Sequence, residues 1–145
     1  MLGIEGCKPV RTRYASFDRI AIPAKVADAS VIGAIAFGEP QQDQARALIE
    51  GNDLHAPTLL YYELASIART KIRQDPDHHD EILSSLLDAL AMGIELHDAS
   101  YVAITRLALD TGLSTYDASY LHLARHLRVP LVTFDRRLQR AAEGG

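Results

Sequence analysis

Short apolar runs alternate with longer stretches of helical spacing from residue 24 onward, and this alternation constrains the fold more than any other feature. The apolar runs predict strands at residues 24–27, 54–56, 94–96 and 130–133. Helical spacing and helix-start residues predict helices at residues 30–37, 41–50, 57–73, 75–91, 98–112, 117–128 and 136–142. Strands separated by helices form a parallel sheet covered on both faces, so we predict an α/β fold.

The composition fits one domain and excludes several classes of protein. The chain has 145 residues, of which 48% are apolar, so it can bury a core of ordinary size. The formal net charge of −4 argues against a strongly basic, non-specific nucleic-acid binder. The single cysteine, Cys7, excludes an intramolecular disulfide and a cysteine-based zinc cage.

Residues 1–23 differ from the rest of the chain. They contain glycines, prolines and scattered arginines without either periodicity, so we predict an N-terminal extension, followed by a single domain over residues 24–142. The extension lacks the apolar region of a signal peptide, and apolar runs such as residues 31–37 are too short to cross a bilayer. We therefore expect a cytoplasmic protein that does not associate with membranes.

Four carboxylates occupy positions that fit either a structural role, such as helix capping, or a role in a functional site. Asp28 and Asp135 each follow a predicted strand, at the sheet edge where parallel α/β folds bind ligands. Glu63 lies beside the apolar stripe of helix 57–73, where it is either solvated or compensated by a cation. Asp117 begins a predicted helix. Asp-Ala-Ser occurs at Asp28, Asp98 and Asp117, and helix capping explains all three copies equally well.

The segments at residues 25–31, 62–65, 113–118 and 131–138, taken together and in this order, resemble the PIN-domain family, and within it the VapC toxins of toxin–antitoxin pairs. The resemblance implies a three-layer α/β/α fold with a short, mainly parallel sheet of four to five strands. It also implies an acidic catalytic and metal-binding site. The residues that match the family's four acids are Asp28, Glu63, Asp117 and Asp135.

The resemblance also separates the three Asp-Ala-Ser copies, because Asp98 matches a helix start outside the site, where it is expected to act as a cap. Ser30 and Thr133 match hydroxyl positions that support the first and last aspartates, and Thr115 lies where it could support Asp117. The implied activity is hydrolysis of RNA, with an antitoxin protein as partner and a homodimer as the assembly. Oxygen ligands favour Mg²⁺, or Mn²⁺, over zinc as the cofactor.

Other enzymes with an aspartate after the first strand fit poorly. Haloacid-dehalogenase-like phosphatases and response-regulator receivers both need a lysine late in the chain, whereas the last lysine here is Lys71. Two alternatives stay open: a PIN-domain nuclease outside a toxin–antitoxin pair, and a catalytically silent PIN-like module that binds RNA or protein. His122 and His126 lie four residues apart without a third ligand, so we interpret them as surface or interface residues.

The helix over residues 57–73 carries more apolar side chains than one core stripe needs. Leu59, Tyr61 and Tyr62 lie outside the stripe of Leu60 and Leu64. They predict either a groove for the amphipathic helix of a partner or internal packing against the helix at residues 75–91.

Overall fold

The computed structural model describes residues 22–144, so most of the predicted N-terminal extension lies outside the described residues. The elements follow one another in this order: β1 (Ala24–Ala27), α2 (Ala29–Ala36), α3 (Gln42–Ile49), β2 (Asp53–Pro57), α4 (Leu59–Gln74), the 3₁₀ turn η1 (Pro76–His78), α5 (His79–Leu90), β3 (Glu95–His97), α6 (Tyr101–Thr111), α7 (Thr115–Leu127), β4 (Leu131–Val132) and α8 (Arg136–Glu143).

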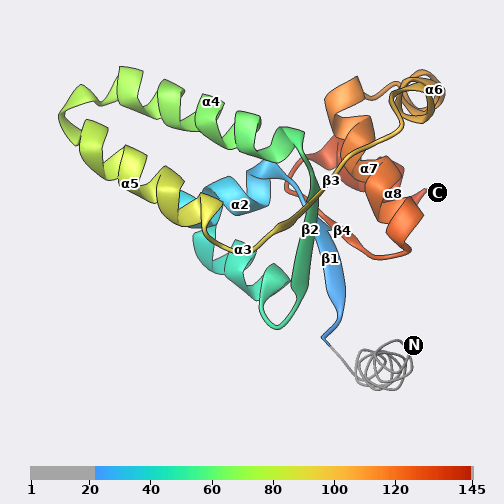
Figure 1. Cartoon of the computed structure of the whole chain (residues 1–145), viewed down its shortest axis with the longest axis horizontal. Coiled ribbons are helices and arrows are strands. Elements are labelled where there is room, and N and C mark those ends of the chain that lie inside the picture. The colour runs from blue at the N-terminus through green and yellow to red at the C-terminus, as the bar shows by residue number, and fades with distance from the viewer. Residues whose placement is uncertain (1–21, 145) are drawn as a thin grey trace, which may run out of the picture.

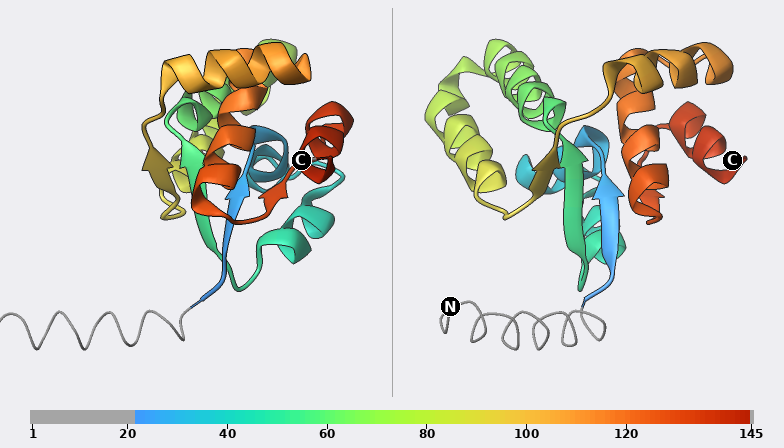
Figure 2. Two further views of the ribbon diagram at one scale, coloured as in Figure 1. Left: turned by 90° about the vertical axis from the view of Figure 1, so that its right-hand side faces the viewer. Right: turned by 45° about the vertical axis from the view of Figure 1, so that its right-hand side comes forward.

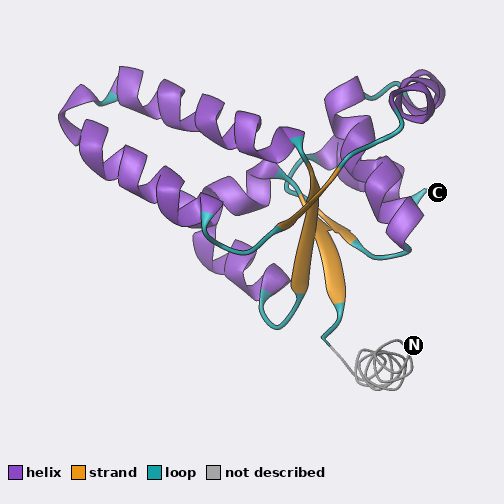
Figure 3. Ribbon diagram, in the orientation of Figure 1, coloured by secondary structure: helices purple, strands orange, loops and turns teal. Residues whose placement is uncertain are grey.

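The strands form one four-stranded sheet in the order β3-β2-β1-β4, and every pair is parallel. Helices α2 to α5 lie on one side of the sheet and α6 to α8 on the other (Figure 1; Figure 2 gives two further views). Figure 3 shows how small the sheet is beside the helices around it. The three-layer parallel α/β fold is therefore confirmed, with four strands, because each short apolar run could reach a neighbour only through a helical crossover.

The core forms where α7 and α4 pack against the central strands. Helix α7 contributes mostly buried side chains from Ala118 to Ala124, and α4 buries Leu60, Leu64 and Ala68, as its apolar stripe predicts. Helices α2 and α4 approach closely at Gly33, where an added Cβ would lie 3.1 Å from Ile67 Cδ1. The glycine thus keeps α4 close to the helix that begins at the end of β1.

Two predicted helix starts are wrong because a nearby serine caps the helix in place of the expected aspartate. Ser100, not Asp98, caps α6, and its Oγ accepts the N–H of Ala103. Helix α7 begins at Thr115, two residues before the predicted start, because Ser114 Oγ accepts the Asp117 N–H at 3.1 Å. Serine caps as well as aspartate, so the pattern alone did not distinguish them. Asp117 therefore lies inside the first turn and does not cap α7.

Two further boundaries differ from the prediction. Pro57 is the last residue of β2, whereas it was expected to open the next helix. Strand β4 covers only Leu131–Val132, which places Asp135 three residues after the strand and not directly behind it. Among the described residues, no helix is both long enough and apolar enough to cross a membrane.

Candidate active site

Asp28 is the most firmly held of the four predicted acids. It follows β1, caps α2 and is only 6% exposed. Its Oδ1 accepts the Ser30 hydroxyl at 2.6 Å and the backbone N–H groups of Ser30 and Val31. Its Oδ2 accepts the Thr133 hydroxyl at 2.5 Å. The predicted support of Asp28 by two hydroxyl side chains is thus present, and together these bonds fix the orientation of the carboxylate.

The same two hydroxyls fix the segment that carries Asp135. Ser30 Oγ accepts the N–H of Phe134 at 2.9 Å, and Thr133 Oγ1 accepts the N–H of Asp135 at 3.0 Å. Asp135 itself caps α8, since its Oδ1 accepts the Leu138 N–H at 2.9 Å. Asp135 therefore acts as a helix cap through Oδ1, and its other carboxylate oxygen remains for a second role.

Glu63 is held by a tyrosine of α7 that was not among the residues predicted for the site. The Tyr120 hydroxyl donates to Glu63 Oε1 at 2.6 Å, and Tyr120 is 1% exposed. Burial and the Glu63 carboxylate raise the pKa of Tyr120 strongly, so the phenol stays protonated and acts as a donor. The signal in the sequence was spacing: Tyr120 lies three residues after Asp117, on the same side of α7.

The four acids influence one another through their charges. Burial raises the pKa of Asp28 above its usual value, although hydrogen bonds from Ser30, Thr133 and Val31 oppose the shift. The pKa of Glu63 is raised as well; burial is the largest cause, and the charges of Asp28 and Asp117 raise it further.

Asp117 extends this coupling to the fourth acid. Burial and the nearby Asp135 raise the pKa of Asp117, while its hydrogen bond from Ser114 and the Arg137 guanidinium act in the opposite direction. Arg137 is itself fixed by donation to the Gly112 carbonyl at 2.7 Å. The four acids come from segments far apart in the sequence, at the ends of strands and the starts of helices. Together they create one region of negative potential, which attracts cations.

The carboxylates are spaced too widely for three of them to share one ion directly. Within residues 22–144, the group of three possible metal ligands with all donor atoms within 4.8 Å of one another is His55, Glu95 and His97. These three residues were not predicted from the sequence, although the alternation Glu95-x-His97 in a strand places both side chains on one face. Mg²⁺ usually keeps several waters and contacts one or two carboxylates directly, so the oxygen-only chemistry of the four acids fits this ion.

Thr115, expected in a loop that supports Asp117, is the first residue of α7, and Ser114 makes the local hydrogen bond in its place. Beside Glu63, a cavity of about 410 Å³ extends along α4, past Ser66, Thr70 and Lys71. Of the four acids, Glu63 is the one that lines this cavity, so the cavity leads to the acidic region from the side of α4.

Comparison with known proteins agrees with this fold. The family model of the PIN domain matches residues 25–144. The chain is 33% identical over 118 residues to Ribonuclease VapC3 of Pyrobaculum aerophilum, a match that covers 78% of this chain and 90% of that protein.

Two solved structures are also similar. The crystal structure of PAE2754 from Pyrobaculum aerophilum has a TM-score of 0.68 and 26% identity, covering 85% of this chain and 89% of that one. The structure of Mycobacterium tuberculosis VapC20, described as a toxin that cleaves the sarcin-ricin loop, has a TM-score of 0.60. Its identity is 13%, with 81% of this chain and 95% of that chain covered, so this likeness concerns the fold alone.

Proposed function

This chain belongs to the PIN-domain family and is VapC-like, and on that premise we propose that it is a metal-dependent endoribonuclease, the toxin of a toxin–antitoxin pair. The observation that carries the proposal is the convergence of the four acids Asp28, Glu63, Asp117 and Asp135. Ser30 and Thr133 join the segments that carry Asp28 and Asp135, and Tyr120, on the helix of Asp117, donates to Glu63. Helix capping accounts for Asp28 and Asp135 individually, but not for bringing four partly buried carboxylates together, because without a cation each charge raises the free energy of its neighbours.

In this proposal, Asp28, Glu63, Asp117 and Asp135 hold Mg²⁺, or Mn²⁺, either directly or through water. The ion, when bound, stabilises negative charge on a phosphodiester and makes a coordinated water more acidic. Hard carboxylate oxygens are the ligands that suit this ion.

The protein supplies orientation. Asp28 cannot rotate freely, because both of its oxygens accept hydrogen bonds from fixed hydroxyls. Tyr120 fixes Glu63 through Oε1, which leaves Oε2 to face the ion or a water. An RNA strand would approach along the cavity beside α4, where the Lys71 ammonium is paired with Glu39 at 3.0 Å and would exchange that carboxylate for a phosphate.

RNA is the proposed substrate because the curated relative is a ribonuclease, and its hydrolysis would take place in the cytoplasm. The proposed partners are an antitoxin and a second copy of the chain. Of the apolar residues considered for a partner groove, Tyr61 packs internally, donating to the Leu90 carbonyl at 3.4 Å, and Leu59 is half-buried. Tyr62, by contrast, is 81% exposed.

Tyr62 does not stand alone. With Tyr101 and Tyr116, which are 79% and 65% exposed, it borders an apolar cavity of about 240 Å³ between α4, α6 and α7. Exposed aromatic side chains around a hollow are typical of contact surfaces, and this is where we propose that a protein partner binds.

The test uses purified protein, a structured RNA and a matched pair of variants. Wild type should cleave with Mg²⁺ or Mn²⁺ and stop in chelator, and Asp28→Asn should be inactive. Asp98→Asn changes the same Asp-Ala-Ser motif at an exposed position outside the cluster and should cleave like wild type. Cleavage that survives both chelator and Asp28→Asn would overturn the mechanism.

The toxin assignment has its own test. Co-expression with the product of an adjacent small gene should yield a complex with suppressed cleavage. If that product neither binds nor inhibits, the toxin assignment fails while the nuclease assignment stands.

A further inference from the structure

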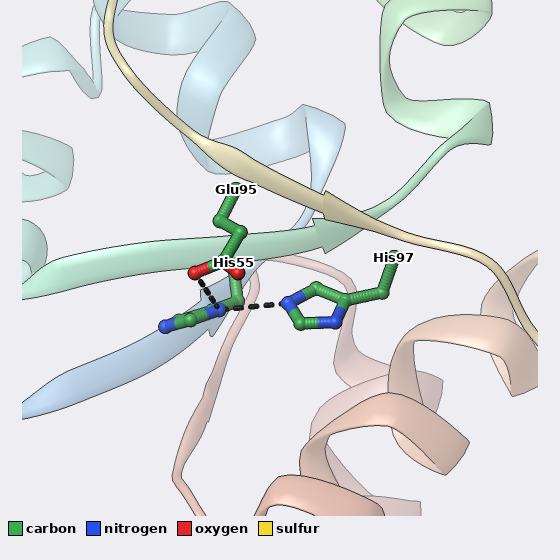
Figure 4. A group of neighbouring side chains, drawn as sticks. All are labelled: His55, Glu95 and His97. Carbon is green, nitrogen blue, oxygen red and sulfur yellow. Dashed lines mark hydrogen bonds and ion pairs between the residues drawn. The ribbon is translucent and has the colours of Figure 1, made fainter. Parts of the chain in front are cut away.

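A second cluster of metal-ligating side chains lies on neighbouring strands, apart from the four acids. His55 comes from the middle of β2, and Glu95 and His97 are the first and last residues of β3. In the parallel register His55 pairs with Glu95, and Pro57 pairs with His97. Glu95 and His97 are two residues apart, so all three side chains project from the same face of the sheet, as Figure 4 shows.

The donor atoms already converge. His55 Nδ1 lies 2.8 Å from His97 Nε2 and 3.4 Å from Glu95 Oε2. Two imidazole nitrogens at this distance must share one proton, since one has to donate and the other accept. A metal ion can replace that proton and bind all three groups at once.

The distances suit a tetrahedral ion. With metal–nitrogen bonds of about 2.0–2.1 Å, neighbouring ligand atoms of a tetrahedral site are about 3.3 Å apart. The contact to Glu95 has this spacing already, and the two rings need to separate by only about half an ångström. Two imidazoles and one carboxylate are a ligand set that zinc uses, whereas Mg²⁺ prefers oxygen ligands.

We propose that His55, Glu95 and His97 form a zinc-binding site that joins the edge strand β3 to β2. The His55 side chain is 16% exposed and that of Glu95 is 67% exposed, so the nitrogen ligand is sheltered and the carboxylate leaves a path for the ion to enter. A fourth position remains for water.

The site has a structural consequence for the rest of the molecule. Strand β3 is only three residues long and lies at the edge of the sheet. The carbonyl of His97 accepts the N–H of Thr58, directly before α4 begins. An ion that fixes β3 to β2 therefore stabilises the segment from which the Glu63 helix starts.

A nearby histidine pair supplies the matched control. His122 and His126 on α7 have stacked rings with centroids 6.3 Å apart, and they line the same small cavity as His97. They are the alternative place for a transition metal on this side of the sheet.

The experiment measures Co²⁺ binding by its ligand-field absorption, with Zn²⁺ as competitor. The full chain is first stripped with chelator, and excess Mg²⁺ is present throughout to saturate carboxylate sites. Wild type should bind one equivalent of Co²⁺ and release it to Zn²⁺. Both Glu95→Gln, an exposed change that should leave folding intact, and His97→Gln should weaken binding by at least about tenfold.

The double variant His122→Ala/His126→Ala and the variant Asp28→Asn should bind Co²⁺ like wild type. Zn²⁺ at about one hundred times its wild-type Kd should raise the Tm of wild type by roughly 10 °C, and the same Zn²⁺ concentration should raise the Tm of Glu95→Gln by about half as much or less. The proposal is overturned if wild type binds no stoichiometric Co²⁺, if Glu95→Gln and His97→Gln bind normally, or if binding is lost in the double variant. None of these results depends on cleavage of RNA, so the nuclease proposal stands or falls separately.

Discussion

Replacing Tyr120 with phenylalanine removes the one hydroxyl that holds Glu63 and leaves the buried ring in place. The donor lies 2.6 Å from a carboxylate oxygen, and hydrogen bonds to charged groups contribute about 1.5–3 kcal/mol. Because Glu63 is half-buried, the lower value, about 1.5 kcal/mol, is the appropriate one. Tyr120 acts on the reaction only by holding Glu63, so this energy is the upper bound of the loss in the transition state. Since about 1.4 kcal/mol corresponds to a factor of ten in rate, kcat/KM for RNA cleavage should fall by up to about tenfold at neutral pH.

The same substitution should also shift the pH dependence of cleavage in a defined direction. The Tyr120 hydroxyl lowers the pKa of Glu63, against burial and the charges of Asp28 and Asp117, which raise it. Without the hydroxyl the pKa of Glu63 rises further, so less of the enzyme carries an ionised Glu63 at any acidic pH. The acid limb of the pH profile should therefore move to higher pH, and the loss of activity should be largest at low pH.

The assay is kcat/KM for a structured RNA across the acid limb at saturating Mg²⁺. Tyr116→Phe is the control, because Tyr116 lies one turn earlier on α7 and is 65% exposed. Its profile should overlay that of wild type. An acid limb in Tyr120→Phe that stays in place, or moves to lower pH, would refute the positioning role of Tyr120.

Three further predictions concern stability without metal. First, the free energy of unfolding should fall as pH rises through the raised folded-state pKa values of Asp28, Glu63 and Asp117. The reason is that the folded protein then carries charges that cost less free energy in the unfolded chain. Urea unfolding below and above these pKa values checks this, and added Mg²⁺ should restore the stability. Asp117→Asn should leave the free energy of unfolding unchanged or raise it by up to about 1 kcal/mol, whereas Ser114→Ala should lower it by about 1 kcal/mol. The reverse order would mark Asp117 as a structural residue. Thr133→Val should cost about 1–3 kcal/mol by thermal or urea unfolding, because Asp28 Oδ2 and the Asp135 N–H both lose their partner; an unchanged curve would contradict the network.

Local pattern determined the architecture of this protein. The alternation of short apolar runs with helical spacing predicted a parallel sheet between helical layers, since periodicity reports which face of each element is buried. The apolar stripe of α4 through Leu60 and Leu64 was predicted for the same reason and is buried. Boundaries were less certain, because serine and aspartate cap equally well, and Ser100 and Ser114 took the positions expected of aspartates.

The relations between distant residues were decided only in three dimensions. Asp28, Asp98 and Asp117 open the same tripeptide, which the local pattern could not separate and the family resemblance did. The fold gives the physical reason, because Asp28 and Asp117 lie close enough to Glu63 for their charges to raise its pKa, whereas Asp98 is exposed. The Tyr120–Glu63 hydrogen bond joins residues 57 positions apart, and the His55–His97 contact joins residues 42 apart. Composition and periodicity are properties of single segments, whereas a site depends on which segments the sheet order and the helix packing bring together.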